Sequence, residues 1–153
     1  FYVNELANKI KSKKINKLNN HKKVLYVLEP LRQNWLKNQA FGEIEVLDFF
    51  LENISKLDQT NSFDIKLRPH PSHKFGKFED WVNNNQLFKI SIDYENSLED
   101  CIAWADIVIG CETFALVIAE AAEKRCITSI PPYGPDCRLK INKLEYLRDL
   151  KVN

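Results

Sequence analysis

The chain has 153 residues, of which 44% are hydrophobic, so a single core can remove roughly two thirds of the unfolded surface from water. Its 22 basic and 21 acidic residues leave a net charge of +1, which does not favour a polyanion, and we expect no nucleic-acid partner. No apolar run approaches the roughly 20 residues of a membrane span, and the cysteines and histidines lack the spacing of zinc ligands. We therefore expect a cytoplasmic protein with reduced cysteines and with neither a metal nor another cofactor.

A lysine-rich segment opens the chain. Residues 1–23 hold seven lysines and a single acid, Glu5, and their apolar residues recur at helical spacing. We interpret this segment as a helix or interdomain linker that precedes a nucleotide-binding domain at residues 24–153. Its positive charge also suits peripheral association with the inner face of a membrane. Because the chain has no methionine, even at its first position, we expect it to be the C-terminal part of a longer protein.

Strands and helices alternate from residue 24 onward. Short apolar runs predict strands that are buried on both faces, whereas apolar residues at helical spacing predict helices between them. The predicted strands are 24–28, 63–67, 88–92, 106–110 and 126–130. The predicted helices are 41–57, 75–85, 97–105, 113–124 and 141–150, and the third begins with a weak capping box, Ser97 with Asp100.

This alternation predicts an α/β fold of the Rossmann type. Right-handed crossovers give a parallel sheet of about five strands, in the order 3-2-1-4-5, inside a three-layer αβα sandwich. In such a sheet, ligands bind outside the carboxyl ends of the strands, where the strand order reverses. The first and fourth strands meet at that point, so the residues that follow them and the neighbouring second strand form the candidate site.

The segment after the second strand reads Arg68-Pro69-His70-Pro71. Two prolines fix the backbone of a loop that presents a guanidinium and an imidazole together. We expect Arg68 and His70 to bind a phosphate or diphosphate and to steady a leaving nucleotide, with His70 as the catalytic residue. The alternative is structural, with Arg68 paired to a surface acid and His70 capping the next turn. His73, just beyond this loop, ranks below His70.

The fourth strand ends in Gly110-Cys111-Glu112-Thr113, at the start of a helix. Unpaired N–H groups and the positive end of the helix dipole attract an anion there, and the Thr113 hydroxyl either donates to a phosphate or only caps the helix. A helix start also lowers a thiol pKa, which makes Cys111 a candidate nucleophile, although the sequence offers no base for it beyond His70.

Further polar residues follow the first and fifth strands. Glu29 follows the first strand, and Glu29 and Glu112 are candidates for an acid/base pair, for ribose binding or for hydrogen bonds from loop N–H groups. Tyr133 lies in the Pro-Pro-Tyr-Gly-Pro loop after the fifth strand, where it either stacks on a nucleobase or packs at the rim of the site.

These motifs and their order resemble the C-terminal, donor-binding half of GT-B glycosyltransferases. The resemblance covers roughly residues 24–135 and is strongest toward the bacterial sialyltransferase-like and the capsule or lipooligosaccharide transferases. It rests on the Arg68-Pro69-His70-Pro71 loop, on the strand that ends in Gly110-Cys111-Glu112-Thr113, and on the alanine-rich helix and the strand that follow.

The resemblance implies that the chain binds a nucleotide-sugar donor, of the CMP type rather than the UDP type, in an inverting bacterial enzyme of surface polysaccharide or lipooligosaccharide synthesis. His70 would contact the donor phosphate and assist departure of the nucleotide. Thr113 and the N–H groups around Cys111 and Glu112 would grip the same phosphate, although the family has serines at those two positions. Because GT-B enzymes react between two domains, an N-terminal acceptor-binding domain with the catalytic base would be missing, and the fragment alone would be inactive.

Two other functions stay open on the same residues. The first is half of a sugar-nucleotide 2-epimerase, which shares the architecture and would favour UDP over CMP. The second is a non-catalytic interaction module that binds a nucleotide or a phosphate.

Overall fold

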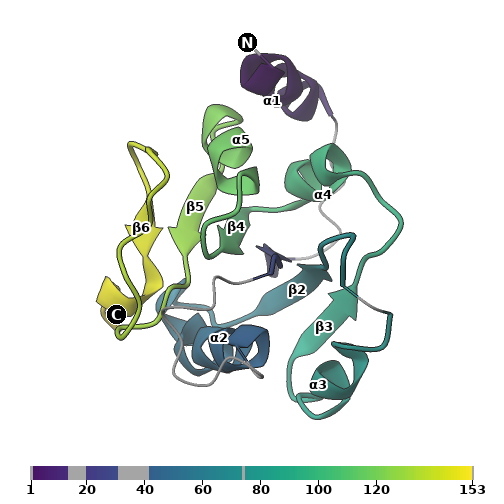
Figure 1. Ribbon diagram of the computed structural model, residues 1–153, viewed down its shortest axis with the longest axis vertical. Helices are drawn as coiled ribbons and strands as arrows, with labels where there is room; N and C mark the ends of the chain where they lie inside the picture. Colours follow the sequence, from purple (N-terminus) through teal and green to yellow (C-terminus); the bar gives the residue numbers. More distant parts are fainter. Residues whose placement is uncertain (1, 14–19, 31–41, 74, 153) are drawn as a thin grey trace.

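The sheet of this chain has six parallel strands in the order β3-β2-β1-β4-β5-β6 (Figure 1). The computed structural model describes residues 2–13, 20–30, 42–73 and 75–152. The strands are β1 Lys22–Val27, β2 Phe63–Arg68, β3 Lys89–Ile92, β4 Ile107–Gly110, β5 Arg125–Thr128 and β6 Glu145–Tyr146. The predicted parallel sheet and its order are therefore confirmed, and β6 extends it by one edge strand.

Helices cover both faces of the sheet and give the predicted three layers. The α-helices are α1 Tyr2–Ser12, α2 Gly42–Asn53, α3 Glu79–Asn83, α4 Leu98–Trp104 and α5 Ala115–Ala121. Alternate residues of each strand point to opposite faces. Figure 1 shows α2 on one side of the sheet and α1, α4 and α5 on the other. Tyr26 and Ile109 pack with α2 in one core cluster, and Leu25 and Val108 pack with α1, α4 and α5 in the other.

The lysine-rich segment forms a helix where the structure describes it. Leu6, Ala7 and Ile10 of α1 are buried against α4 and α5. Two lysines, one in the helix and one just after it, make ion pairs with that layer, Lys11 with Glu123 at 3.4 Å and Lys13 with Asp100 at 2.6 Å. Residues 14–19 lie outside the described residues, and the linker role stays a prediction. Among the described residues, no helix has the length and apolar character to cross a membrane.

The predicted helix at 141–150 is wrong. Residues 145–146 form β6 beside β5, and a 3-10 turn, η3, follows at Leu147–Asp149. The apolar residues that suggested one helical face pack on opposite sides of the sheet, since Leu147 is buried in the α2-side core whereas Ile141 and Leu144 pack on the other side. Glu145 is also held by Arg125 of β5, with N–O distances of 2.7 and 3.0 Å.

Most of the other predicted helices are shorter than the sequence suggested. The helix predicted at 75–85 spans only Glu79–Asn83, because Gly76 adopts a φ of +99° that a right-handed helix cannot contain. The helix predicted at 41–57 ends at Asn53 and continues as a 3-10 turn, η2, at Ile54–Lys56. Ser97 caps α4 as predicted, with its hydroxyl accepting from the Asp100 N–H at 3.1 Å.

Candidate functional site

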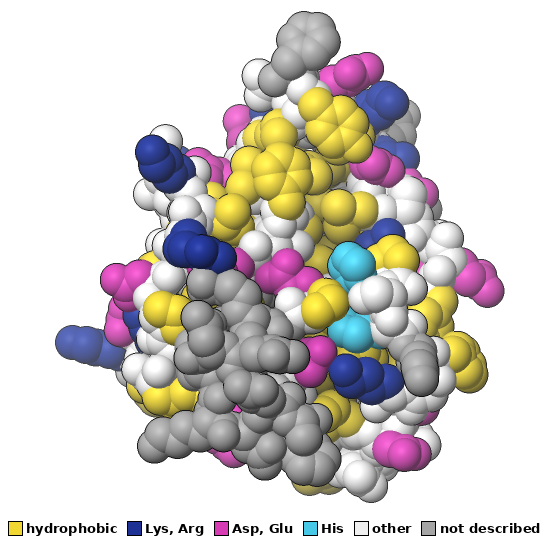
Figure 2. Space-filling model, viewed as in Figure 1, with side chains coloured by type: hydrophobic (Ala, Val, Ile, Leu, Met, Phe, Trp, Pro, Cys, Tyr) yellow, Lys and Arg dark blue, Asp and Glu magenta, His cyan; other side chains and the backbone are white. Residues whose placement is uncertain are grey.

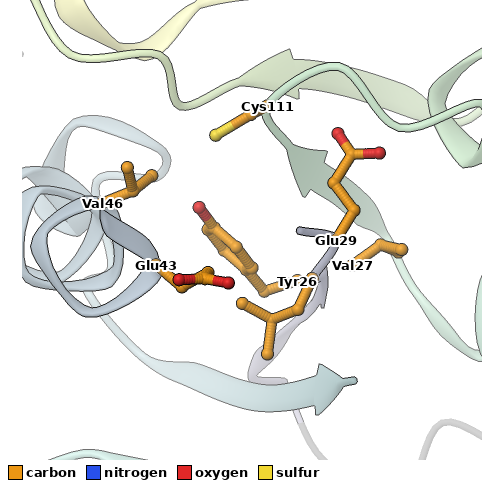
Figure 3. A pocket seen from close by; sticks show the side chains of 7 residues that line it. Tyr26, Val27, Glu29, Glu43, Val46 and Cys111 are labelled. Carbon is orange, nitrogen blue, oxygen red and sulfur yellow. The ribbon is translucent and has the colours of Figure 1, made fainter. Parts of the chain in front are cut away.

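A pocket opens where the strand order reverses, between the carboxyl ends of β1 and β4 and the start of α2 (Figure 3). It encloses about 210 Å³, counted out to its opening. Its lining residues are Tyr26, Val27, Leu28, Glu29, Glu43, Val46 and Cys111. This is the position at which open parallel sheets bind their ligands.

The Tyr26 ring and the Cys111 thiol form the inner end of the pocket. The Tyr26 hydroxyl lies 2.5 Å from Ser129 Oγ, and Cys111 Sγ lies 3.7 Å from the same oxygen. Burial raises the pKa of Cys111 to about 12 and also raises the pKa of Tyr26 well above its ordinary value. These shifts favour the protonated form of both groups at neutral pH, which argues against Cys111 as a thiolate nucleophile.

Glu29 and Glu112 are brought together as the sequence predicted. The Glu112 N–H donates to Glu29 Oε1 at 2.9 Å, and the Arg138 N–H donates to Glu112 Oε2 at 2.8 Å. Each carboxylate thus accepts from a loop N–H, which is one of the roles that the sequence left open. The Glu112 N–H, which was predicted to bind a phosphate, donates to Glu29 instead.

Gly110 and Thr113 form a close turn between β4 and α5. A Cβ atom on residue 110 would lie 2.5 Å from Thr113 Cγ2 and 3.0 Å from the Val27 carbonyl oxygen, so only glycine fits. The Thr113 hydroxyl accepts from the Ala115 N–H at 3.2 Å, so it supports the start of α5 from one residue before the N-cap, Phe114. Its contact with a phosphate stays a prediction.

The His70 loop is fixed by hydrogen bonds as well as by its prolines. The Ser72 N–H donates to His70 Nδ1 at 3.1 Å, and Ser72 Oγ lies 2.8 Å from the same nitrogen. A neutral His70 therefore carries its proton on Nε2, because Nδ1 must accept. The His70 N–H in turn donates to His73 Nδ1 at 3.0 Å, so the loop holds both imidazoles in one arrangement.

His73 connects this loop to the pocket through Glu43. His73 Nε2 lies 3.5 Å from Glu43 Oε1, and Lys77 Nζ lies 3.1 Å from the same oxygen. Burial alone would raise the pKa of Glu43, but its own N–H and Lys77 outweigh burial and lower it, so Glu43 is ionised at neutral pH. Burial, aided by the nearby Lys77, lowers the pKa of His73, which stays neutral. Figure 2 shows histidine side chains among acidic and apolar ones on this face.

Sequence reasoning missed Glu43. This residue lies in the first turn of α2, where acids are common because they stabilise the helix dipole. The available signal was its position, since the helix that follows the first strand starts beside the point where the strand order reverses.

Arg68 points away from the pocket. Its Nη1 donates to the Asn96 carbonyl oxygen at 2.5 Å and lies 3.9 Å from Cys101 Sγ of α4, on the face opposite Tyr26. The structure therefore separates Arg68 from His73 and Glu43. Its role in nucleotide binding stays a prediction.

Tyr133 bridges two elements above the sheet. Its hydroxyl donates to Glu45 Oε2 of α2 at 2.8 Å, and its side chain is half exposed. Arg148 fixes the same loop by donating to the Pro131 and Gly134 carbonyl oxygens at 3.1 and 2.9 Å. Stacking of Tyr133 on a base stays a prediction.

Comparisons with known proteins identify a shared fold. No family model and no curated protein matches the chain. Among solved structures, the chain is similar to KpsC of Thermosulfurimonas dismutans, a beta Kdo 2,7 transferase, with a TM-score of 0.51 and 15% sequence identity. The match covers 99% of this chain and 49% of that structure, so this chain spans about half its length. At this identity, the likeness shows that the two proteins share a fold.

The described residues offer no obvious metal centre. Within the described part of the chain, no group of three or more histidine, cysteine, aspartate or glutamate side chains is arranged to hold a metal ion.

Proposed function

We propose that this chain is the donor-nucleotide-binding half of an inverting bacterial glycosyltransferase that builds a surface polysaccharide or lipooligosaccharide. The observation that carries the proposal is the pocket at the reversal point of the strand order, which the His70 loop approaches through His73 and Glu43. The fold shared with a beta Kdo 2,7 transferase supports a transferase over other uses of this architecture.

In this proposal, His70 contacts the donor phosphate. With Nδ1 accepting from Ser72, the Nε2–H of a neutral imidazole is the group available to donate to a phosphate oxygen. Such a donor stabilises the charge that develops on the leaving nucleotide, and it needs no protonated histidine to do so. Thr113 and Arg68 are the further phosphate contacts proposed from the sequence.

The reaction also needs groups that these residues do not supply. The donor is proposed to be of the CMP type. The acceptor site and the catalytic base are proposed to belong to an N-terminal acceptor-binding domain. The enzyme is proposed to lie at the cytoplasmic face of the membrane, with the lysine-rich segment facing the membrane. The chain alone should therefore bind nucleotide and transfer no sugar.

Isothermal titration calorimetry with CMP, UMP and UDP tests the proposal. We expect CMP to bind more tightly than the uridine nucleotides, and His70→Ala to weaken CMP binding about tenfold or more, the effect of losing a hydrogen bond to a charged group. His21→Ala is the matched control, because His21 pairs with Asp64 at the opposite ends of the strands. Absence of binding by any nucleotide would contradict the proposal, and a preference for UDP would favour the epimerase alternative.

A further inference from the structure

Glu43 reaches the pocket from α2, on the wall opposite Glu29. The two side chains come from different elements and lie on either side of Tyr26 in Figure 3. The Glu43 side chain is mostly buried, with 15% of its surface exposed, and it sits beside the cationic Lys77. An ionised carboxylate at that depth needs hydrogen-bond donors for its oxygens.

The His73 Nε2–H group faces this carboxylate and has no hydrogen-bond partner among the described residues. Its side chain is 95% buried, and among the described residues its Nε2 is the buried side-chain nitrogen or oxygen that has no hydrogen-bond partner. Because His73 Nδ1 accepts from the His70 N–H, Nε2 carries the proton and faces Glu43 Oε1 at 3.5 Å, too far for a good hydrogen bond.

The size and lining of the pocket limit its ligand. The 210 Å³ between its walls includes open solvent, and the closed space has room for about one water-sized group, so a hydroxyl group of a nucleotide-sugar can enter it and a whole ring cannot. Tyr26, Val27 and Val46 give it apolar walls, and the two glutamates supply acceptors. Carboxylates repel a phosphate, but they accept from hydroxyl groups.

We infer that Glu43 accepts a hydrogen bond from a ring hydroxyl of the ligand, and that His73 is a positioning residue that orients the Glu43 carboxylate. The inference rests on the proposed function and names which part of the donor the pocket takes. A carboxylate acceptor suits a ribose or sugar ring, which carries hydroxyls on several edges, better than cytosine, whose exocyclic amine lies on one edge.

The hydroxyl test compares ligands on the wild-type protein and on Glu43→Gln. We expect Glu43→Gln to lower the affinity about tenfold for the ligand that carries the hydroxyl. If the hydroxyl belongs to the ribose, 2′-deoxy-CMP or 3′-deoxy-CMP binds the wild type about tenfold more weakly than CMP does, and Glu43→Gln removes that difference. If it belongs to the donor sugar, Glu43→Gln leaves CMP binding unchanged and weakens binding of CMP-N-acetylneuraminate.

Controls separate this inference from the proposed function. Glu52→Gln, an exposed position on the same helix, should leave every affinity unchanged. The inference is overturned if Glu43→Gln weakens the binding of neither ligand, or weakens the binding of inorganic phosphate to the same extent. It is also overturned if the loss of affinity in Glu43→Gln is the same with and without the 2′- or 3′-hydroxyl and with and without the donor sugar. If the wild type binds no nucleotide at all, the proposed function fails and this inference fails with it.

The positioning role of His73 is tested by coupling. His73→Phe keeps a ring against Phe78, whose centroid lies 5.1 Å away, but removes the N–H that faces Glu43. We expect His73→Phe to lower ligand affinity about fivefold when Glu43 is present and to cause no further loss of affinity when it is combined with Glu43→Gln. His73→Gln keeps a hydrogen-bond donor and should retain most of the affinity. Circular dichroism checks that all variants are folded. If the two losses of affinity multiply in the double variant, His73 acts independently of Glu43.

Discussion

Two groups of polar side chains lie at the carboxyl ends of the strands, on opposite faces of the sheet, and they differ in how fully their hydrogen bonds are met. The group on the α4 side, here called the Asp93 cluster, consists of Lys66, Asp93, Asn96 and Cys101. Asp93 accepts from the Glu95 and Asn96 N–H groups at 3.0 and 2.9 Å and from Asn96 Nδ2 at 2.7 Å. The pocket side instead buries a His73 N–H with no partner among the described residues.

This difference separates groups that stabilise the fold from groups that we propose bind a ligand. Burial alone would raise the pKa of Asp93, but its N–H donors and Lys66 hold it far below its usual range. A carboxylate with so many donors stabilises the native chain and has little capacity left for a ligand. Buried polar groups are seldom left without a hydrogen-bond partner, so the exception at His73 supports our proposal that the pocket is the functional side.

Asp93→Ala should produce the largest loss of stability. The change removes the acceptor of several partly buried donors and leaves Lys66, 3.4 Å away, without its carboxylate, so we expect a loss of about 3 kcal/mol in the free energy of unfolding. Urea denaturation followed by circular dichroism measures it. Nucleotide affinity of the folded fraction should change less than about twofold, and a large loss of affinity would mean that the Asp93 cluster takes part in binding.

Gly110→Ala should cost somewhat less and acts on the pocket side. The added methyl would lie 2.5 Å from Thr113 Cγ2, so the turn between β4 and α5 must move, at a cost of about 2 kcal/mol. The same denaturation experiment checks it, and the displaced turn should also weaken CMP binding. A variant as stable as the wild type would show that this turn adapts freely.

Low pH should remove the contribution of Asp93 to the free energy of unfolding. Because its folded pKa is depressed, its stabilisation is fully present above its ordinary value of 3.8 and is lost as the pH falls below that value. We expect the wild type to lose about 1 kcal/mol more between pH 4 and pH 3 than Asp93→Asn does. Parallel pH profiles of the two proteins would contradict the assignment.

Glu43→Gln should have the smallest effect on stability. The glutamine side chain keeps the shape of the glutamate and an oxygen to face His73, and it loses the ion pair with the partly exposed Lys77, so the free energy of unfolding should change by less than about 1 kcal/mol. Thermal denaturation checks this. A loss as large as that of Asp93→Ala would make Glu43 a structural residue and would remove the contrast between the two faces.

The fold was largely readable from the sequence because its signals are local. Apolar runs such as 24–28 mark strands buried on both faces, and their alternation with helices fixes a parallel sheet. The last predicted helix failed because Leu147 and Leu144 contribute to different sides of the sheet, which only the tertiary packing decides.

The site was readable only in part, for two physical reasons. Glu29, Cys111 and Glu112 follow strands whose neighbours are set by topology, so their proximity could be predicted. The direction of Arg68 was available from strand alternation, because Leu67 faces α2 and the next side chain must face away. Glu43 had only its position at the start of the helix after the first strand as a signal, because its proposed role depends on the loop that brings His73 against it.

A backbone amide map by NMR tests the central claim most directly. On addition of CMP to the isotope-labelled protein, we expect saturable shifts at His70, at Glu43 and around Cys111 and Thr113, while the amides of the Asp93 cluster stay unchanged. Shifts centred on the Asp93 cluster, or no saturable shift anywhere, would contradict the assignment of the pocket as the nucleotide site.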